Sequence, residues 1–244
     1  PERAEIMWQF EAAVRGIADA CRTLEIPVVS GNVSFYNETD GRAIPPTPTV
    51  GMVGLLEDVE KRVRLPFRRE GDAVALLGET RDELGASEFL RVIHGSDEGP
   101  CPEVDLASEK RLIGLLADLA ERGLLASSHD VSDGGLAVAI AECAMQGNLG
   151  AEIELPFENG IRLSALLFGE STGRAVITFG SNSAEAVRAA AAVAGVPLRE
   201  IGRVASNRLR VSAAGRALLD ESVPALREKW STAFAKAVAS ADVL

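Results

Sequence analysis

Between Gly31 and Gly41 the sequence gathers side chains that could bind a phosphorylated ligand and its metal ion. Glycine lets backbone N–H groups approach a phosphate closely, because no Cβ stands in the way. Asn32 offers a neutral oxygen to a hard cation such as Mg²⁺, and Ser34 can donate a hydrogen bond to a phosphate or carbonyl oxygen. An ordinary polar hairpin loop ending in the turn pair Asp40-Gly41 explains the same run. Residue types alone therefore leave a binding site and a simple turn equally open.

A second polar run, from His129 to Gly135, is expected to form a loop between a strand and a helix. Gly134 and Gly135 would offer free N–H groups to an anion at the start of that helix. Asp130 and Asp133 would repel a bare phosphate unless a metal ion lay between them, and Asp133 could instead cap the helix. His129 beside Asp130 could be an acid–base pair, although histidines more often have structural roles. The run is a secondary phosphate or metal candidate.

Other chemistries find little support in the sequence. Glu170–Gly173 is interpreted as a surface turn. No Walker A or GxGxxG pattern occurs, and no Cys/His cluster has zinc spacing. With two histidines in the chain, a Ser-His-Asp triad would have to use His129.

The first part of the chain should position the Gly31–Gly41 run. Apolar residues recur at helical spacing over residues 4–24, and Pro27 ends that helix. An apolar strand over 26–30 should lead into the run, and a proline-rich extended segment should follow at 44–48. A further strand is predicted over 49–56.

The rest of the chain alternates predicted strands and helices, which favours an α/β to α+β fold with a mixed sheet covered by helices. A domain boundary near Leu65-Pro66 divides it from the first part. The remaining expected elements are strand 73–77, helix 88–93, helix 106–121 with Asp105 as its cap, strand 124–127, helix 136–146, strand 151–155, helix 161–168, strand 174–179, helix 182–194 with an Asn182/Glu185 capping box, strands 199–204 and 208–211 as a hairpin at Ser206-Asn207, and helix 223–239.

Composition narrows the possible partners. The chain has 244 residues, a formal net charge of −11 and a pI of about 4.8, and it lacks the dense basic face of a nucleic-acid binder. No apolar run is long enough to span a membrane, and no signal peptide is visible. Three cysteines far apart in the sequence suggest free thiols in a reducing cytoplasm.

Four motifs carry a family resemblance: Gly31–Thr39, Ile44–Pro48, His129–Leu136 and Phe168–Ser171. Together they resemble the synthetase subunit of phosphoribosylformylglycinamidine synthases of the small, multi-subunit form. The likeness runs through the whole chain. The His129–Leu136 element alone is shared with the wider aminoimidazole ribonucleotide synthetase superfamily.

The resemblance implies an ATP-dependent ligase of purine biosynthesis, with ATP and Mg²⁺ as cofactors. In that family ATP activates the amide oxygen of formylglycinamide ribonucleotide, and glutamine-derived ammonia displaces phosphate to form the amidine. By position, Gly31 resembles a nucleotide contact, Asn32 a magnesium ligand and Ser34 a substrate contact. A glutaminase subunit and a small bridging subunit are the implied partner proteins.

The resemblance also implies a domain organisation. Residues 1–65 would be the C-terminal part of the second smaller domain, and 66–244 the whole second larger domain, which resembles the C-terminal domain of aminoimidazole ribonucleotide synthetase. The family's catalytic histidine lies in an N-terminal half that this chain lacks. No catalytic residue is therefore expected here, the isolated chain should be inactive, and the N-terminal half of the same polypeptide becomes a partner.

Two alternatives stay open at this point. The chain could come from another superfamily enzyme, of the selenophosphate synthetase or thiamine-phosphate kinase type, although the Gly31–Thr39 run argues against this. It could also be a structural or assembly half whose nucleotide site is occupied but does not turn over.

Overall fold

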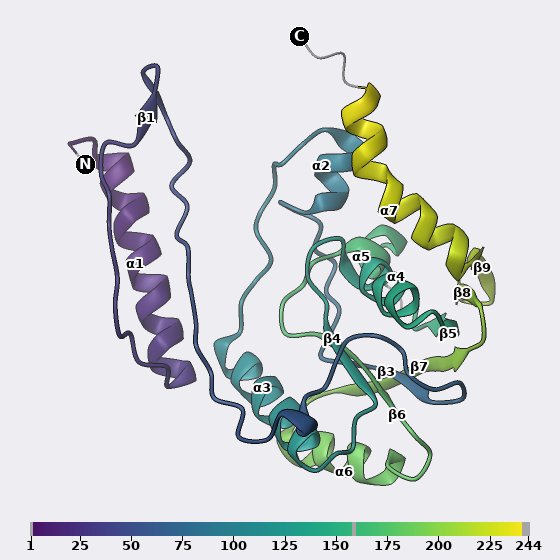
Figure 1. Cartoon of the computed structure of the whole chain (residues 1–244). Helices are drawn as coiled ribbons and strands as arrows, with labels where there is room; N and C mark the ends of the chain where they lie inside the picture. Colours follow the sequence, from purple (N-terminus) through teal and green to yellow (C-terminus); the bar gives the residue numbers. More distant parts are fainter. Residues whose placement is uncertain (1, 158–159, 241–244) are drawn as a thin grey trace. The chain divides into compact units, whose positions relative to one another are not determined.

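The computed structural model describes residues 2–157 and 160–240. The chain forms two compact units, the first ending at Glu57 and the second beginning at Asp58 (Figure 1). Each unit is described by itself below. The boundary expected near residue 65 stays a prediction.

The first unit contains one helix and one short hairpin. Helix α1 spans Ala4–Leu24, as its apolar periodicity predicts. Strands β1 (Glu38–Thr39) and β2 (Arg42–Ala43) pair across Asp40 and Gly41, which both have positive φ, 51° and 74°. Such angles at both central residues are those of a tight hairpin turn. The turn pair therefore forms as the sequence indicates. The Asn37 carbonyl still accepts from the Ile44 N–H across the hairpin, while residues 31–36 lie outside it.

The strands expected at 26–30 and 49–56 do not form, and both predictions are wrong. A strand needs a partner for its backbone N–H and C=O groups. In the described part of this unit no second strand lies beside either segment. Val29 and Val53 are 92% and 102% exposed, so these apolar side chains do not pack against the described part of the unit.

The second unit is built on a seven-stranded mixed sheet of order β4-β6-β3-β7-β5-β8-β9. Only the β5–β8 pair is parallel among the strand pairs of the described residues. Its elements are η1 (Val59–Lys61), β3 (Ala73–Leu77), α2 (Glu88–His94), α3 (Leu106–Glu121), β4 (Ser127–Asp130), α4 (Gly135–Gly147), β5 (Gly150–Leu155), α5 (Leu163–Phe168), β6 (Ala175–Phe179), α6 (Ala184–Ala194), β7 (Leu198–Ala205), β8 (Arg208–Ala213), β9 (Arg216–Ser222) and α7 (Val223–Ser240).

Helices cover both faces of this sheet, which confirms the predicted fold class (Figure 1). Successive side chains of a strand point to opposite faces. In β3, Val74 and Leu76 accordingly join the core beneath α4 and α5, whereas Ala75 and Leu77 join the core beneath α3 and α6. A central strand buried on both faces explains why residues 73–77 read as a continuous apolar run.

The hairpin predicted at Ser206-Asn207 is wrong. Strands β7 and β8 do not pair with each other, because β5 lies between them and pairs with both. The hairpin in this region joins β8 to β9 instead, through Ala214 and Gly215 with φ of 49° and 72°. The capping box expected at Asn182 is also wrong, since Ser183 is the N-cap of α6 and makes no side-chain capping bond.

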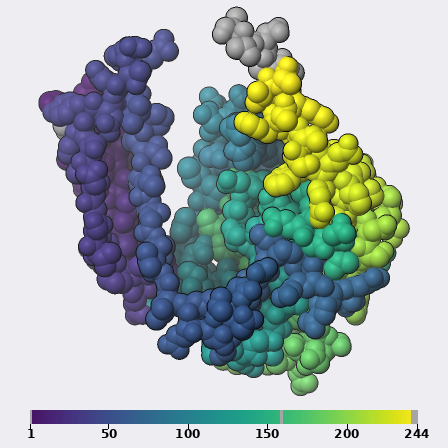
Figure 2. Space-filling view, viewed as in Figure 1, coloured from purple at the N-terminus to yellow at the C-terminus, as the bar shows by residue number. Residues whose placement is uncertain are grey.

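Helix α7 forms where predicted, but its apolar face is covered only at the start. Val223 is buried and Leu226 packs against the core, whereas Trp230 and Phe234 are 60% and 81% exposed. Figure 2 shows α7, in yellow, on the surface of the second unit. Within the described residues, no helix is both long and apolar enough to cross a membrane.

The cysteines differ sharply in their surroundings, which allows a direct test. Cys101 is exposed, whereas burial and the neighbouring Glu142 raise the pKa of the buried Cys143 thiol from 9.0 to about 12. Because the thiolate is the reactive form, Cys143 should resist iodoacetamide at about pH 8 in the folded protein while Cys101 reacts. Mass spectrometry of trypsin digests should show alkylated Cys143 only after denaturation. Alkylation of both at equal rates in the folded chain would contradict the packing around α4.

Candidate functional site

The Gly31–Ser34 run lies in the first unit as an exposed, non-helical segment. A Cβ built on Gly31 would meet nothing within 4 Å, so the chain itself does not require glycine there. Within the described residues, the side chains of Asn32 and Ser34 make no hydrogen bond. An open backbone next to an uncommitted amide and hydroxyl fits the oxygen-rich contacts that Mg²⁺ and phosphate groups use. The donor set therefore suits the predicted ligands.

The residues that follow tie this segment to helix α1. The rings of Phe35 and Phe10 meet edge to face, with centroids 5.3 Å apart and an interplanar angle of 65°. The Tyr36 hydroxyl donates to Glu2 Oε1 at 2.6 Å, a bond that lowers the pKa of Glu2 and raises that of Tyr36. Asn37 Nδ2 donates to the Ser34 carbonyl at 3.3 Å. The site segment is thus held by the residues next to its functional side chains.

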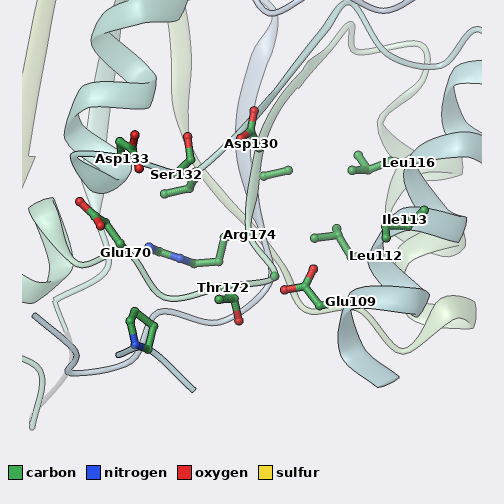
Figure 3. A pocket seen from close by; sticks show the side chains of 14 residues that line it. Glu109, Leu112, Ile113, Leu116, Asp130, Ser132, Asp133, Glu170, Thr172 and Arg174 are labelled. Atoms are coloured by element: carbon green, nitrogen blue, oxygen red, sulfur yellow. The ribbon is translucent and has the colours of Figure 1, made fainter. Parts of the chain in front are cut away.

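The second predicted loop lines a cavity of about 430 Å³ in the second unit (Figure 3). Figure 3 shows Glu109 and apolar side chains of α3 on one wall, facing Asp130 and Thr172. Asp133 and Glu170 lie at the other end. The lining residues are Pro102, Glu109, Leu112, Ile113, Leu116, Asp130, Val131, Ser132, Asp133, Glu170, Thr172, Gly173, Arg174 and Ala175. The cavity thus combines an apolar wall with carboxylates.

Glu170 connects two helix starts beside this cavity. Its Oε1 accepts from the backbone N–H of Gly134 at 2.8 Å and from that of Glu88 at 2.9 Å. The N–H of Gly135 donates to the Ser132 carbonyl at 3.0 Å. Free N–H groups at a helix start attract anions. Here an internal carboxylate already occupies the place in front of α4 that the sequence suggested for a phosphate.

Asp133 is not the cap of α4, contrary to one reading of the sequence. The N-cap is Gly134, with a φ of 81°, and this residue has no side chain with which to cap the helix. Gly135 follows with a φ of 72°. A Cβ on Gly135 would lie 2.7 Å from the Gly169 carbonyl oxygen and 2.7 Å from the carbonyl carbon of Phe168. The glycine pair therefore lets the His129–Leu136 motif pack directly on the Phe168–Ser171 motif.

Arg174 lies at the floor of the cavity and was not predicted from the sequence. It is 3% exposed, and its guanidinium donates to the carbonyls of Ser171 (2.9 Å) and Gly169 (2.6 Å) and to Thr80 Oγ1 (3.1 Å). Burial lowers its pKa from 12.5 to about 10, and the nearby Glu83 opposes that shift. Arg174 thus joins the loop after α5 to Thr80, which follows β3.

Glu83, which interacts electrostatically with Arg174, carries a buried oxygen without a hydrogen-bond partner in the described part of the chain. Its Oε1 accepts from the Glu103 N–H at 3.0 Å, while its Oε2 is buried and has no hydrogen-bond partner within the described residues. Glu83 could not be singled out from the sequence, because its neighbours in space come from residues 103 and 174.

His129 and Asp130 belong to strand β4, not to a loop, and the predicted strand is placed three residues too early. Both ring nitrogens of His129 face carboxylates, with Nδ1 3.1 Å from Asp130 Oδ1 and Nε2 2.8 Å from Glu142 Oε2. Its side chain is 12% exposed. The predicted His129–Asp130 pair exists, and Glu142, about two turns into α4, was missed. This geometry anchors β4 to α4.

The interpretation of Glu170–Gly173 as a surface turn is wrong. Ser171 is fully buried, and its Oγ accepts from the Arg81 N–H at 3.2 Å. Across residues 2–157 and 160–240, no group of three or more His, Cys, Asp or Glu side chains is arranged to hold a metal ion. Asp130 and Asp133 thus line the cavity without forming a metal centre by themselves.

Two known domain families match the two units of the chain. AIR synthase related protein, C-terminal domain, matches residues 69–213, and AIR synthase related protein, N-terminal domain, matches residues 1–56. The chain is 42% identical over 96% of its length to phosphoribosylformylglycinamidine synthase subunit PurL of Alkaliphilus metalliredigens. It is 45% identical over 94% of its length to the same subunit of Moorella thermoacetica. It spans 31% of the length of each of these relatives.

Solved structures show the same fold. Thermotoga maritima PurL complexed with FGAR aligns with a TM-score of 0.59 and 21% identity, over 69% of this chain and 30% of that chain. Thermotoga maritima PurL complexed with ATP aligns with a TM-score of 0.56 over 69% of this chain and 28% of that chain. The likeness expected from the four motifs is confirmed. Because the matched C-terminal domain covers more than half of the sequence, the chain belongs to the AIR synthase related protein family.

Proposed function

We propose that this chain is one part of a phosphoribosylformylglycinamidine synthase, an ATP-dependent ligase of purine biosynthesis that works in the cytoplasm. The observation that carries the proposal is 42–45% identity to PurL subunits over 94–96% of the chain. The chain spans about a third of those relatives, so the activity of the whole protein is proposed and not read from this chain alone.

In this proposal the Gly31–Ser34 segment forms one wall of the site. Gly31 contacts the nucleotide through its backbone, Asn32 is a ligand of Mg²⁺, and Ser34 donates to the ribonucleotide substrate. When bound, ATP supplies the phosphoryl group that activates the substrate amide oxygen. The chain's own residues bind and orient; the catalytic groups belong to the rest of the polypeptide. Support comes from the exposed, uncommitted state of the two side chains.

The names of the solved relatives support the ligands and partners of this proposal. Thermotoga maritima PurL structures include complexes with ATP, ADP, AMPPCP and FGAR, and one structure is of PurLQS. We therefore propose the same nucleotide and substrate here, with a glutaminase subunit and a small bridging subunit as partners that deliver ammonia.

The cavity beside α4 has a secondary place in the proposal. Asp130 and Asp133 line it, so their carboxylates are the groups that could meet a divalent cation. Gly134 and Gly135 shape the backbone there, with both N–H groups engaged inside the chain. We propose this loop as a phosphate or metal contact only where a ligand displaces Glu170.

The experiment that tests the proposal adds the rest of the polypeptide to this chain. Phosphate release is measured with ATP, Mg²⁺, ammonia and formylglycinamide ribonucleotide. The chain alone should show no turnover, and co-expression with the remaining part of the polypeptide should produce it. Asn32→Ala in the complete protein should shift the Mg²⁺ titration midpoint upward by about tenfold, a loss of ~1.4 kcal/mol of binding.

Asn182→Ala serves as the matched control, since Asn182 is an exposed amide far from the predicted site in sequence. Turnover by the isolated chain would refute the proposal that the catalytic groups belong to the rest of the polypeptide. A complete protein that binds nucleotide tightly without turnover would favour an assembly role. An unchanged Mg²⁺ titration in Asn32→Ala would remove Asn32 from the site.

A further inference from the structure

The site segment has two faces. Between Gly31 and Phe35 the backbone has no positive φ among its residues and is neither helical nor turned. In such an extended chain, alternate side chains point in opposite directions. Asn32 and Ser34 therefore share one face, and Val33 and Phe35 share the other. The Phe35 ring lies against Phe10 of α1, so Asn32 and Ser34 face away from that helix.

Tyr36 ends this alternation. Its φ of 61° lies in the left-handed region, which a bulky side chain adopts only when its surroundings hold it there. The contact that stabilises this conformation is the hydrogen bond that the Tyr36 hydroxyl donates to Glu2 Oε1 at 2.6 Å. Glu2 lies just before the first turn of α1, whereas Phe10 lies in the second turn of that helix. Phe35 and Tyr36 thus attach the segment to α1 at two separated points.

We infer that Phe35 and Tyr36 are positioning residues that set the face from which Asn32 and Ser34 meet the ligand. This inference rests on the proposed function. A slip of one residue in an extended segment exchanges its two faces. Without the two attachments, Val33 could turn toward the ligand in place of Asn32 and Ser34. The polar face is therefore fixed by residues that do not themselves touch the nucleotide.

The test uses the complete polypeptide carrying Phe35→Ala, Phe35→Tyr, Tyr36→Phe or Trp8→Ala. Trp8→Ala is the matched control, because Trp8 is an aromatic residue of α1 that is 69% exposed. Phe35→Ala should raise KM for Mg²⁺-ATP and for the ribonucleotide by about tenfold, with kcat changed less than about twofold. Phe35→Tyr keeps the ring and should restore KM, whereas Tyr36→Phe should raise KM by about threefold.

Hydrogen exchange of the 244-residue chain supplies a readout independent of turnover. Phe35→Ala should speed exchange at residues 31–37 and leave the second unit unchanged, because the lost contact is confined to the first unit. Absence of turnover in the complete wild-type protein would count against the proposed function. Hydrogen exchange at residues 31–37 would then still show whether Phe35 holds the segment against α1. Unaltered exchange in Phe35→Ala, or an equal rise in KM with Trp8→Ala, would overturn the inference.

Discussion

Replacing Gly135 by alanine should destabilise the second unit by roughly 3–5 kcal/mol, the sum of two separate costs. The φ of 72° is unfavourable for any residue with a Cβ. The new Cβ would also lie 2.7–2.8 Å from backbone atoms of Phe168 and Gly169, which cannot rotate away as a side chain could. Relief would require α4 to move off the loop after α5. Urea unfolding followed by circular dichroism measures the loss.

Gly114→Ala is the matched control for this substitution. Gly114 lies within α3, has an ordinary helical φ, and a Cβ built on it meets nothing within 4 Å. Alanine there should raise the free energy of unfolding by about 0.5–1 kcal/mol, because it reduces the freedom of the unfolded chain. If Gly135→Ala remained within 1 kcal/mol of the parent, on the order of an ordinary surface change, the contact between the two motifs would be disproved.

The close approach at Gly135 also shows where sequence reasoning succeeds and where it ends. Helix α3 was predicted residue by residue, because Asp105 caps it and Leu112, Leu115 and Leu119 repeat on one face. These signals are local. The predicted hairpin at Ser206-Asn207 was wrong because the same short turn sequence can join two strands that pair with each other or two strands that lie on either side of a third. Here β5 lies between β7 and β8. Strand order depends on contacts between distant residues.

The same limit applies to the candidate sites. The residue types of Gly31, Asn32 and Ser34 suggested binding chemistry, and the Asp40-Gly41 turn suggested a hairpin. In the structure both features are present: an open segment at 31–34 is followed by the hairpin. The roles of Glu170 and Arg174 depend on partners 36 and 94 residues away. Periodicity and motif spacing do not reveal contacts between residues so far apart in the sequence. Glu170–Gly173 was therefore interpreted, mistakenly, as a surface turn.

Glu170→Ala is expected to lower the free energy of unfolding by roughly 2–4 kcal/mol. The carboxylate accepts from two helix starts, and its removal leaves the N–H groups of Gly134 and Glu88 without that partner. Both sites are partly buried, so water replaces the lost acceptor only in part. Urea unfolding of the variant beside the parent measures the difference.

Glu170→Gln separates charge from hydrogen bonding, because its amide oxygen can still accept while the negative charge is gone. It should cost about 1 kcal/mol, between the parent and Glu170→Ala. Added inorganic phosphate supplies a second comparison. In Glu170→Ala the N–H of Gly134 faces an anion-sized gap at the start of α4, so phosphate should stabilise this variant more than the parent. Equal stabilisation of both proteins would mean that the start of α4 does not select anions, and that Glu170 acts there as a structural clamp alone.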